Sequence, residues 1–92
     1  VFGKKLLIIV MIPAAVEEFF FRGLIQGSFS RRFGKNWGLI ISALLFAIAH
    51  FSTWYFPYFF VLGAFFAYLR NYSDDLSLCT LAHILVNLYA LI

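Results

Sequence analysis

Residues 6–28 form an apolar segment long enough to cross a membrane, yet Glu17 and Glu18 stand side by side near its middle. A carboxylate at bilayer depth costs several kcal/mol, so such residues usually face a protein interior, find polar partners and mark a functional site. Arg22 follows Glu18 by four residues and therefore lies on the same helical face. The segment is predicted to be a helix that carries a buried, functional polar cluster.

The composition indicates that lipid is the main solvent of this chain. Hydrophobic residues make up 64% of the sequence and charged residues 12%, against roughly 25% charged in ordinary soluble domains. Four apolar segments are predicted as helices, at residues 6–28, 37–51, 55–69 and 76–92. The first has the ~20 residues that a spanning helix needs, and the shorter ones suit tilted or partly buried helices. We expect an all-α, polytopic transmembrane helix bundle, with residues 1–92 as one unit of a longer chain.

Two polar turns, residues 31–36 and 71–75, separate these helices and are expected on one face of the membrane. Asn36 is a candidate N-cap for the second helix, and Asp74 or Asp75 for the last. The net charge of +3 comes from basic residues near helix ends, which suits lipid phosphates better than nucleic acid. Cys79 is the single cysteine, so no disulfide can form within the chain.

Small residues repeat at a spacing of four on two of the predicted helices. The pairs are Gly23-x-x-x-Gly27 and Gly63-x-x-x-Ala67. Helices in lipid associate through close backbone approach, so both pairs are predicted to be packing devices. Pro13 is expected to kink the first helix.

The spacing of the polar residues gives the two glutamates different surroundings. At about 100° per residue, Glu18, Arg22 and Gln26 share one stripe, and Glu17 points about 100° away from Glu18. Glu18 and Arg22 are therefore expected to form an ion pair. Glu17 has no charge partner on its own helix, which leaves it available as an acid or a base.

Two further polar pairs have the same spacing of four residues, Phe46 with His50 and His83 with Asn87. At a rise of about 1.5 Å per residue, Glu17, His50 and Asn87 lie roughly 17 to 20 Å from the polar turns. His83 lies roughly 12 Å from its turn by the same rise. All four are predicted to meet in one layer. A lone buried histidine is usually structural, but such a group of acids, bases and amides indicates function.

Three ordered motifs thus stand on separate predicted helices: Glu17-Glu18-x-x-x-Arg22, Phe46-x-x-x-His50 and His83-x-x-x-Asn87. Together they resemble the CPBP family of intramembrane proteases, also called the ABI or CAAX protease family. The resemblance implies a glutamate-dependent endopeptidase without a cofactor, embedded in a bacterial plasma membrane. Its expected partners are the lipid bilayer and a membrane-anchored, prenylated or bacteriocin-like peptide, and no nucleic acid.

The resemblance also implies a role for each residue. Glu17 and His50 would hold and activate the attacking water, and His83 and Asn87 would stabilise the oxyanion. The residues that would support the site are Glu18, Arg22 and Phe46.

Other functions stay open. Glu17, His50 and His83 could act as a His2Glu zinc site in a metalloprotease, although the His-Glu-x-x-His spacing is missing. Cys79 precedes His83 by four residues and could act as a thiol nucleophile, but it is better explained as a packing residue. The same polar cluster could conduct protons or ions, or belong to a non-catalytic immunity protein.

Overall fold

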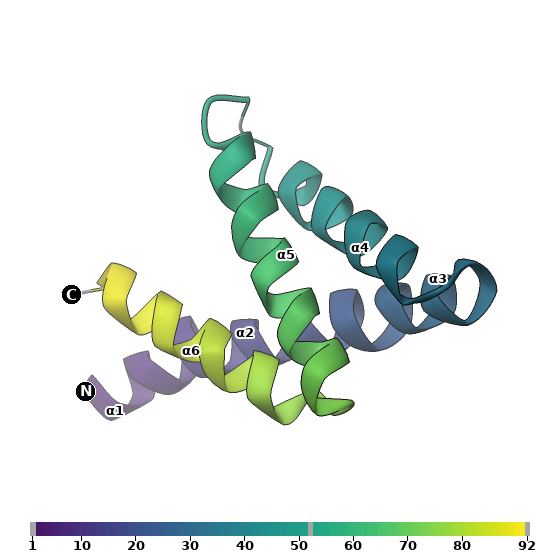
Figure 1. Ribbon diagram of the computed structural model, residues 1–92. Coiled ribbons are helices and arrows are strands. Elements are labelled where there is room, and N and C mark those ends of the chain that lie inside the picture. Colours follow the sequence, from purple (N-terminus) through teal and green to yellow (C-terminus); the bar gives the residue numbers. More distant parts are fainter. Residues whose placement is uncertain (1, 52, 92) are drawn as a thin grey trace.

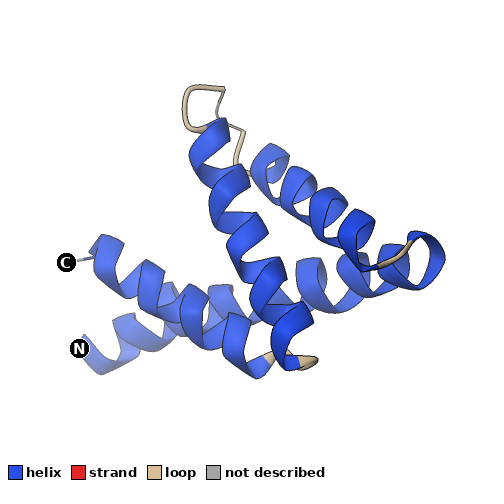
Figure 2. Ribbon diagram, viewed as in Figure 1, coloured by secondary structure: helices blue, strands red, loops and turns tan. Residues whose placement is uncertain are grey.

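The chain folds into helices joined by short turns, and the computed structural model, which describes residues 2–51 and 53–91, contains no strand there (Figure 2). The predicted all-α fold is confirmed. In chain order the elements are α1 (Phe2–Lys5), η1 (Leu6–Met11), α2 (Ile12–Glu18), η2 (Phe19–Ile25), α3 (Gln26–Phe33), α4 (Lys35–Ala49), α5 (Phe56–Ser73) and α6 (Ser77–Leu91). Elements η1 and η2 are π-helical.

The first five elements follow one another without a turn and form one helical run (Figure 1). Pro13 stands at the start of α2, directly after η1 and inside the continuous run, so the hydrogen bond that a backbone N–H would donate there is missing. At this predicted kink position the hydrogen bonding changes from π to α type. Among the described residues, no helix has both the length and the apolar character that a membrane span requires. Residues 6–28, predicted as one helix, lie within this continuous run, in which π and α hydrogen bonding alternate.

The helix ends confirm one predicted cap and correct another. The backbone N–H of Ser77 donates to Asp75 Oδ1 at 3.0 Å, so Asp75 caps α6 as predicted. Asp74 instead ends α5 with a left-handed φ of 56°. The prediction for Asn36 is wrong, because α4 begins before it and has Gly34 as its N-cap. Gly34 adopts a φ of 99°, which a residue with a side chain would adopt only under strain.

The helices fold back on one another through close backbone contacts. Helix α4 packs on α3 and along α5, and α6 returns along α2 and η1 (Figure 1). A Cβ on Gly38 would collide with the hydroxyl of Ser30, so α3 and α4 approach closely there. A Cβ on Gly63 would lie 3.0 Å from Phe46 Cδ2 and 3.2 Å from Ala43 Cα. Glycine at these two positions sets the distances between the helices.

The core is a cluster of aromatic rings with one thiol. Phe21, Phe46, Phe66 and Cys79 are all buried in it. Phe46 meets the rings of Phe21 and Phe66 edge to face, with centroids 5.5 Å and 6.1 Å apart. This arrangement is favoured by the aromatic quadrupole. The core therefore holds α4, α5, α6 and the first helical run together around Phe46.

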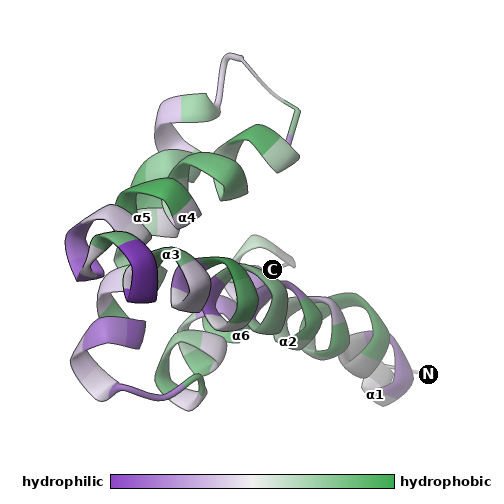
Figure 3. Cartoon of the chain, turned by 90° about the vertical axis from the view of Figure 1, so that its right-hand side faces the viewer, coloured by the Kyte–Doolittle hydropathy of each residue, from purple (hydrophilic) through white to green (hydrophobic). Residues whose placement is uncertain are grey.

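The exterior is apolar along the helices and polar at one end. Val16, Leu24, Val61 and Leu85 are each more than half exposed, although they belong to different helices. Figure 3 shows hydrophobic colouring along α4 and α5 and hydrophilic colouring at the end of α3. Residues of both polar turns line one hollow, so the two turns lie at the same end of the molecule, as predicted. An apolar exterior of this kind needs a cover other than water.

Candidate active site

Glu18 and Arg22 form the predicted ion pair inside the bundle. Arg22 Nε lies 3.3 Å from Glu18 Oε1, and both side chains are fully buried. Arg22 Nη2 also donates to the Gly63 carbonyl oxygen on α5 at 2.9 Å. The guanidinium carbon lies 4.6 Å from the ring centre of Phe46 and 5.4 Å from that of Phe66, within cation–π range. The ion pair thus ties the first helical run to α4 and α5.

Gln26 continues the polar stripe one turn after Arg22. Its Nε2 donates to the Ala67 carbonyl oxygen and to Asn71 Oδ1, each at 3.0 Å. Ala67 follows Gly63 by four residues, as Gln26 follows Arg22. The Gly63-x-x-x-Ala67 pair therefore permits close packing and also presents two backbone oxygens to two side-chain donors.

His83 of α6 stands between the two adjacent glutamates. Its Nδ1 lies 2.6 Å from Glu18 Oε2, and its Nε2 lies 3.5 Å from Glu17 Oε1. The side chains of His83 and Glu18 are buried, whereas that of Glu17 is 39% exposed. The two glutamates thus differ in surroundings, as their spacing predicts. The contact of His83 with Glu18 is an addition that the sequence did not predict.

These contacts restrict where the proton of His83 can be. Glu18 accepts the hydrogen bond as the partner of Arg22, so Nδ1 of His83 is the donor. Nε2 then faces the Glu17 carboxylate at 3.5 Å.

Glu17 and Asn87 line the same open hollow of about 350 Å³, between α2, η1 and α6. The other lining residues are Ile9, Val10, Pro13 and Ala90. Both polar side chains are partly exposed there. The hollow has the size of a ligand site with apolar walls and a few polar groups.

His50 lies at the C-terminal end of α4. Its Nδ1 donates to the Phe46 carbonyl oxygen at 2.7 Å, which leaves Nε2 as an acceptor. The ring stacks on Phe59 of α5, with centroids 4.0 Å apart. No hydrogen bond or ion pair of the described residues joins His50 to Glu17. Of the predicted layer, the structure joins Glu17 to His83 at 3.5 Å and places Glu17 and Asn87 on one hollow.

Phe46 connects the two histidines through its buried ring. The ring centre lies 4.6 Å from that of His50 and 5.9 Å from that of His83. The Arg22 guanidinium covers the same ring. Phe46 therefore packs against both histidines of the candidate site.

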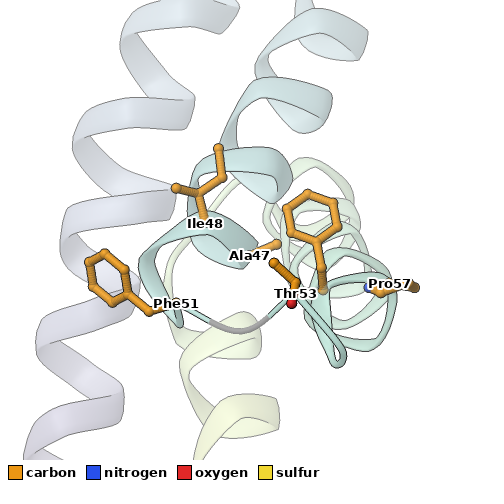
Figure 4. Close-up of a pocket in the computed structure, with 6 residues that line it drawn as sticks. Ala47, Ile48, Phe51, Thr53 and Pro57 are labelled. Atoms are coloured by element: carbon orange, nitrogen blue, oxygen red, sulfur yellow. The ribbon is translucent and has the colours of Figure 1, made fainter.

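A second hollow, of about 400 Å³, lies beside His50 where α4 gives way to α5 (Figure 4). Its lining residues are Ala47, Ile48, Phe51, Thr53, Phe56 and Pro57. Only Thr53 brings a polar side chain, so this hollow suits a hydrocarbon group.

The alternative chemistries receive little support from the geometry. Within residues 2–51 and 53–91, no three His, Cys, Asp or Glu side chains form a group that could hold a metal ion. Of the proposed His2Glu zinc set, only Glu17 and His83 are joined by a contact in the part of the chain that the structure describes, at 3.5 Å. Cys79 is buried and its Sγ donates to the Leu76 carbonyl oxygen at 3.3 Å. A buried thiol of this kind cannot reach a substrate.

Another buried contact of the region was not predicted from the sequence. Ser42 Oγ donates to the Phe21 carbonyl oxygen at 3.1 Å. Phe21 belongs to the π-helical η2, where the hydrogen-bond ladder departs from the α pattern. The sequence feature that could have indicated this contact is Ser42 itself, a single serine within the apolar stretch of α4.

Comparison with known proteins places the chain in a family. A family model described as type II CAAX prenyl endopeptidase Rce1-like matches residues 4–89. No curated protein and no solved structure matches significantly. The matched range contains all three motifs, from Glu17 to Asn87, and it confirms the predicted resemblance. The chain therefore belongs to the Rce1-like family of type II CAAX prenyl endopeptidases.

Proposed function

We propose that this chain forms the catalytic core of an endopeptidase that cleaves a membrane-anchored or prenylated CAAX-type peptide, within or beside the membrane. Besides family membership, one observation carries the proposal. The Glu17 carboxylate lies 3.5 Å from His83 Nε2 and opens onto the hollow that Asn87 also lines. Amide hydrolysis needs a base for water and donors for the oxyanion, and this group has both.

In the proposed reaction, Glu17 accepts a proton from a water molecule in the hollow. The water oxygen then bonds to the carbonyl carbon of the substrate, and the carbonyl oxygen becomes an oxyanion. When the C–N bond breaks, the proton held by Glu17 passes to the leaving amine. The partial exposure of Glu17 supports this role, because the base must reach both water and substrate.

His83 and Asn87 are proposed to stabilise the oxyanion. The Asn87 amide can donate hydrogen bonds but cannot act as a base. The proximity of His83 Nε2 to Glu17 supports a donor at the reacting centre. Such donors act best when they are already oriented before the reaction. Glu18 would provide that orientation for His83, and Arg22 would hold Glu18.

His50 is proposed as the second residue that holds the water, on the basis of the family motif. Its Nδ1 is directed to the Phe46 carbonyl oxygen, so Nε2 is the ring nitrogen that could bind water. The apolar hollow in Figure 4, lined by Ala47, Ile48 and Phe51 close to His50 in the sequence, would suit the hydrocarbon part of a prenylated substrate.

We further propose that the protein is embedded in a membrane, as expected for the plasma membrane of a bacterium. The exposed apolar side chains on several helices support lipid contact. The polar turns gathered at one end support an interfacial position for that end.

The deciding experiment measures cleavage of a prenylated, membrane-anchored peptide by the full-length protein in detergent. Glu17→Gln should abolish turnover while the thermal unfolding temperature stays unchanged, because Glu17 is partly exposed. Asp74→Asn is the matched control, since it also removes an exposed carboxylate, but one at the C-terminal end of α5 that does not line the hollow of Glu17. Wild-type turnover in the Glu17 variant would refute the assignment.

The proposed reaction uses no metal, and its rival would use zinc to activate the water. Elemental analysis and cleavage after exhaustive chelation test this point. We expect unchanged turnover. Stoichiometric zinc, loss of turnover on its removal and recovery on its return would refute the metal-free reaction.

A further inference from the structure

A polar hollow of about 170 Å³ lies between α3, the start of α4 and the C-terminal turns of α5. The side chains that matter for its chemistry are Arg22, Gln26, Ser30, Arg31, Lys35 and Arg70. The hollow is lined from elements that are far apart in the sequence, and Asn71 and Asp74 of the second polar turn also line it. Of the motif residues only Arg22 reaches it, and none of the groups proposed to react lines it.

The hollow carries an excess of positive charge. Four of its cationic side chains face one acid, Asp74, which pairs with Arg70 at 3.5 Å. Arg22 is neutralised from the other side by Glu18. Among the described residues, Arg31 and Lys35 take part in no ion pair. An anion that entered the hollow would therefore be attracted by at least two uncompensated charges.

The walls also contain buried polar atoms without partners. Arg22 and Gln26 are 0% and 2% exposed, yet Arg22 Nη1 and Gln26 Oε1 have no hydrogen-bond partner among the described residues. Ser30 Oγ and Arg70 Nε are in the same situation. Buried groups of this kind are normally paired with protein, water or a ligand. Three of these four atoms can donate a hydrogen bond, and all four belong to residues that line the hollow.

We propose that this hollow binds a phosphate group. A phosphate presents several acceptor oxygens at once, and arginine guanidinium groups bind such oxygens with good geometry. Gln26 Oε1 would accept a hydrogen bond from a hydroxyl attached to the same group. The phosphate could be that of a lipid headgroup or a free phosphate, because basic residues at an interface attract both. The site shares Arg22 with the supporting ion pair but contains none of the groups proposed to react.

Isothermal titration of inorganic phosphate into the full-length protein, in detergent at constant ionic strength, tests the site. The double variant Arg31→Gln, Lys35→Gln should bind phosphate roughly tenfold more weakly or worse, because it loses charge-assisted hydrogen bonds. Arg32→Gln is the matched control, since Arg32 is exposed next to Arg31 but does not line the hollow. It should bind as the wild type does. The single variant Lys35→Gln gives the same test if the double variant does not fold.

Native mass spectrometry distinguishes the two sources of the phosphate. The protein is extracted from vesicles of phosphatidylcholine with phosphatidylglycerol, and the retained phosphatidylglycerol is measured for each variant. Retention that is lost in the double variant supports a headgroup site, and phosphate binding without retention supports a site for a free phosphate. The proposal is overturned if the wild type neither binds phosphate nor retains the lipid. It is also overturned if Arg32→Gln weakens phosphate binding as much as the double variant does.

Discussion

Nδ1 of His83 lies 2.6 Å from Oε2 of Glu18, although the two residues are 65 positions apart in the chain. Glu18 is at the same time the partner of Arg22, at 3.3 Å. Buried charged and polar groups therefore form a series from Arg22 through Glu18 to His83, and the series ends at the partly exposed Glu17. A carboxylate that binds one nitrogen of an imidazole sets its tautomer and orientation, and so prepares the other nitrogen for chemistry.

The ion pair should dominate the stability of the fold. Glu18→Gln and Arg22→Ala should each lower the free energy of unfolding by about 3 to 5 kcal/mol, because each strands a buried charge. The double variant should lose less than the sum, because the two residues interact directly. Thermal and denaturant unfolding of the full-length protein in detergent measure the effect.

The pair of Arg70 with Asp74 is the matched control, because it has the same spacing of four residues but an Asp74 side chain that is 88% exposed. Asp74→Asn should change the free energy of unfolding by about 0 to 1 kcal/mol. Equal losses in the buried and exposed pairs would contradict the importance of burial.

Asn87 should affect turnover more than substrate binding. We expect Asn87→Ala to lower kcat by roughly 10² to 10³ with little change in KM, the usual loss for one oxyanion donor. Steady-state kinetics on a prenylated peptide measure both constants, and the exposed Asn36→Ala serves as control. A large rise in KM with an intact kcat would make Asn87 a binding residue instead.

Two glycines of the bundle should respond to alanine in opposite ways. Gly63→Ala places a methyl group 3.0 Å from Phe46 Cδ2 and 3.2 Å from a backbone atom of Ala43, and should destabilise the fold by about 1 to 3 kcal/mol. Gly23→Ala meets only side chains at ordinary contact distance, those of Leu76 at 3.5 Å and Phe19 at 3.9 Å, and should stabilise its helix by up to about 1 kcal/mol. Unfolding measurements that rank the two variants in the reverse order would contradict the close approach of α4 and α5.

The cap of α6 should make stability depend on acid pH. The backbone N–H of Ser77 donates to Asp75 and holds the pKa of that carboxyl below its ordinary value. A lowered folded pKa means that the ionised form stabilises the fold above the unfolded pKa of about 3.9, and that this contribution is lost as the pH falls through the folded pKa. Asp75→Ala should therefore lower the unfolding temperature at neutral pH and lose this effect in acid.

Asp75→Asn separates the cap from the charge, because asparagine also caps helices but does not titrate. The difference in unfolding temperature between the asparagine and alanine variants should stay constant with pH. A difference that vanished in acid would mean that another group titrates.

The features that the sequence predicts correctly depend on short-range geometry. The pairing of Glu18 with Arg22 and the cap at Asp75 involve residues at most four positions apart, so helix geometry alone brings them together. The helical class follows in the same way from long apolar segments between polar turns. The cap at Asn36 was predicted wrongly because Gly34 can reverse the chain with a positive φ.

Only the tertiary structure decided how the helices meet. Their rotation and separation depend on where backbones can approach, and Gly63 permits such an approach for α4 and α5. That packing, together with the division of the first run into π and α pieces, directs His83 toward Glu18 and leaves His50 stacked on Phe59. Spacing within one helix determines which residues share a face, but contacts between helices depend on crossings that residue spacing does not specify.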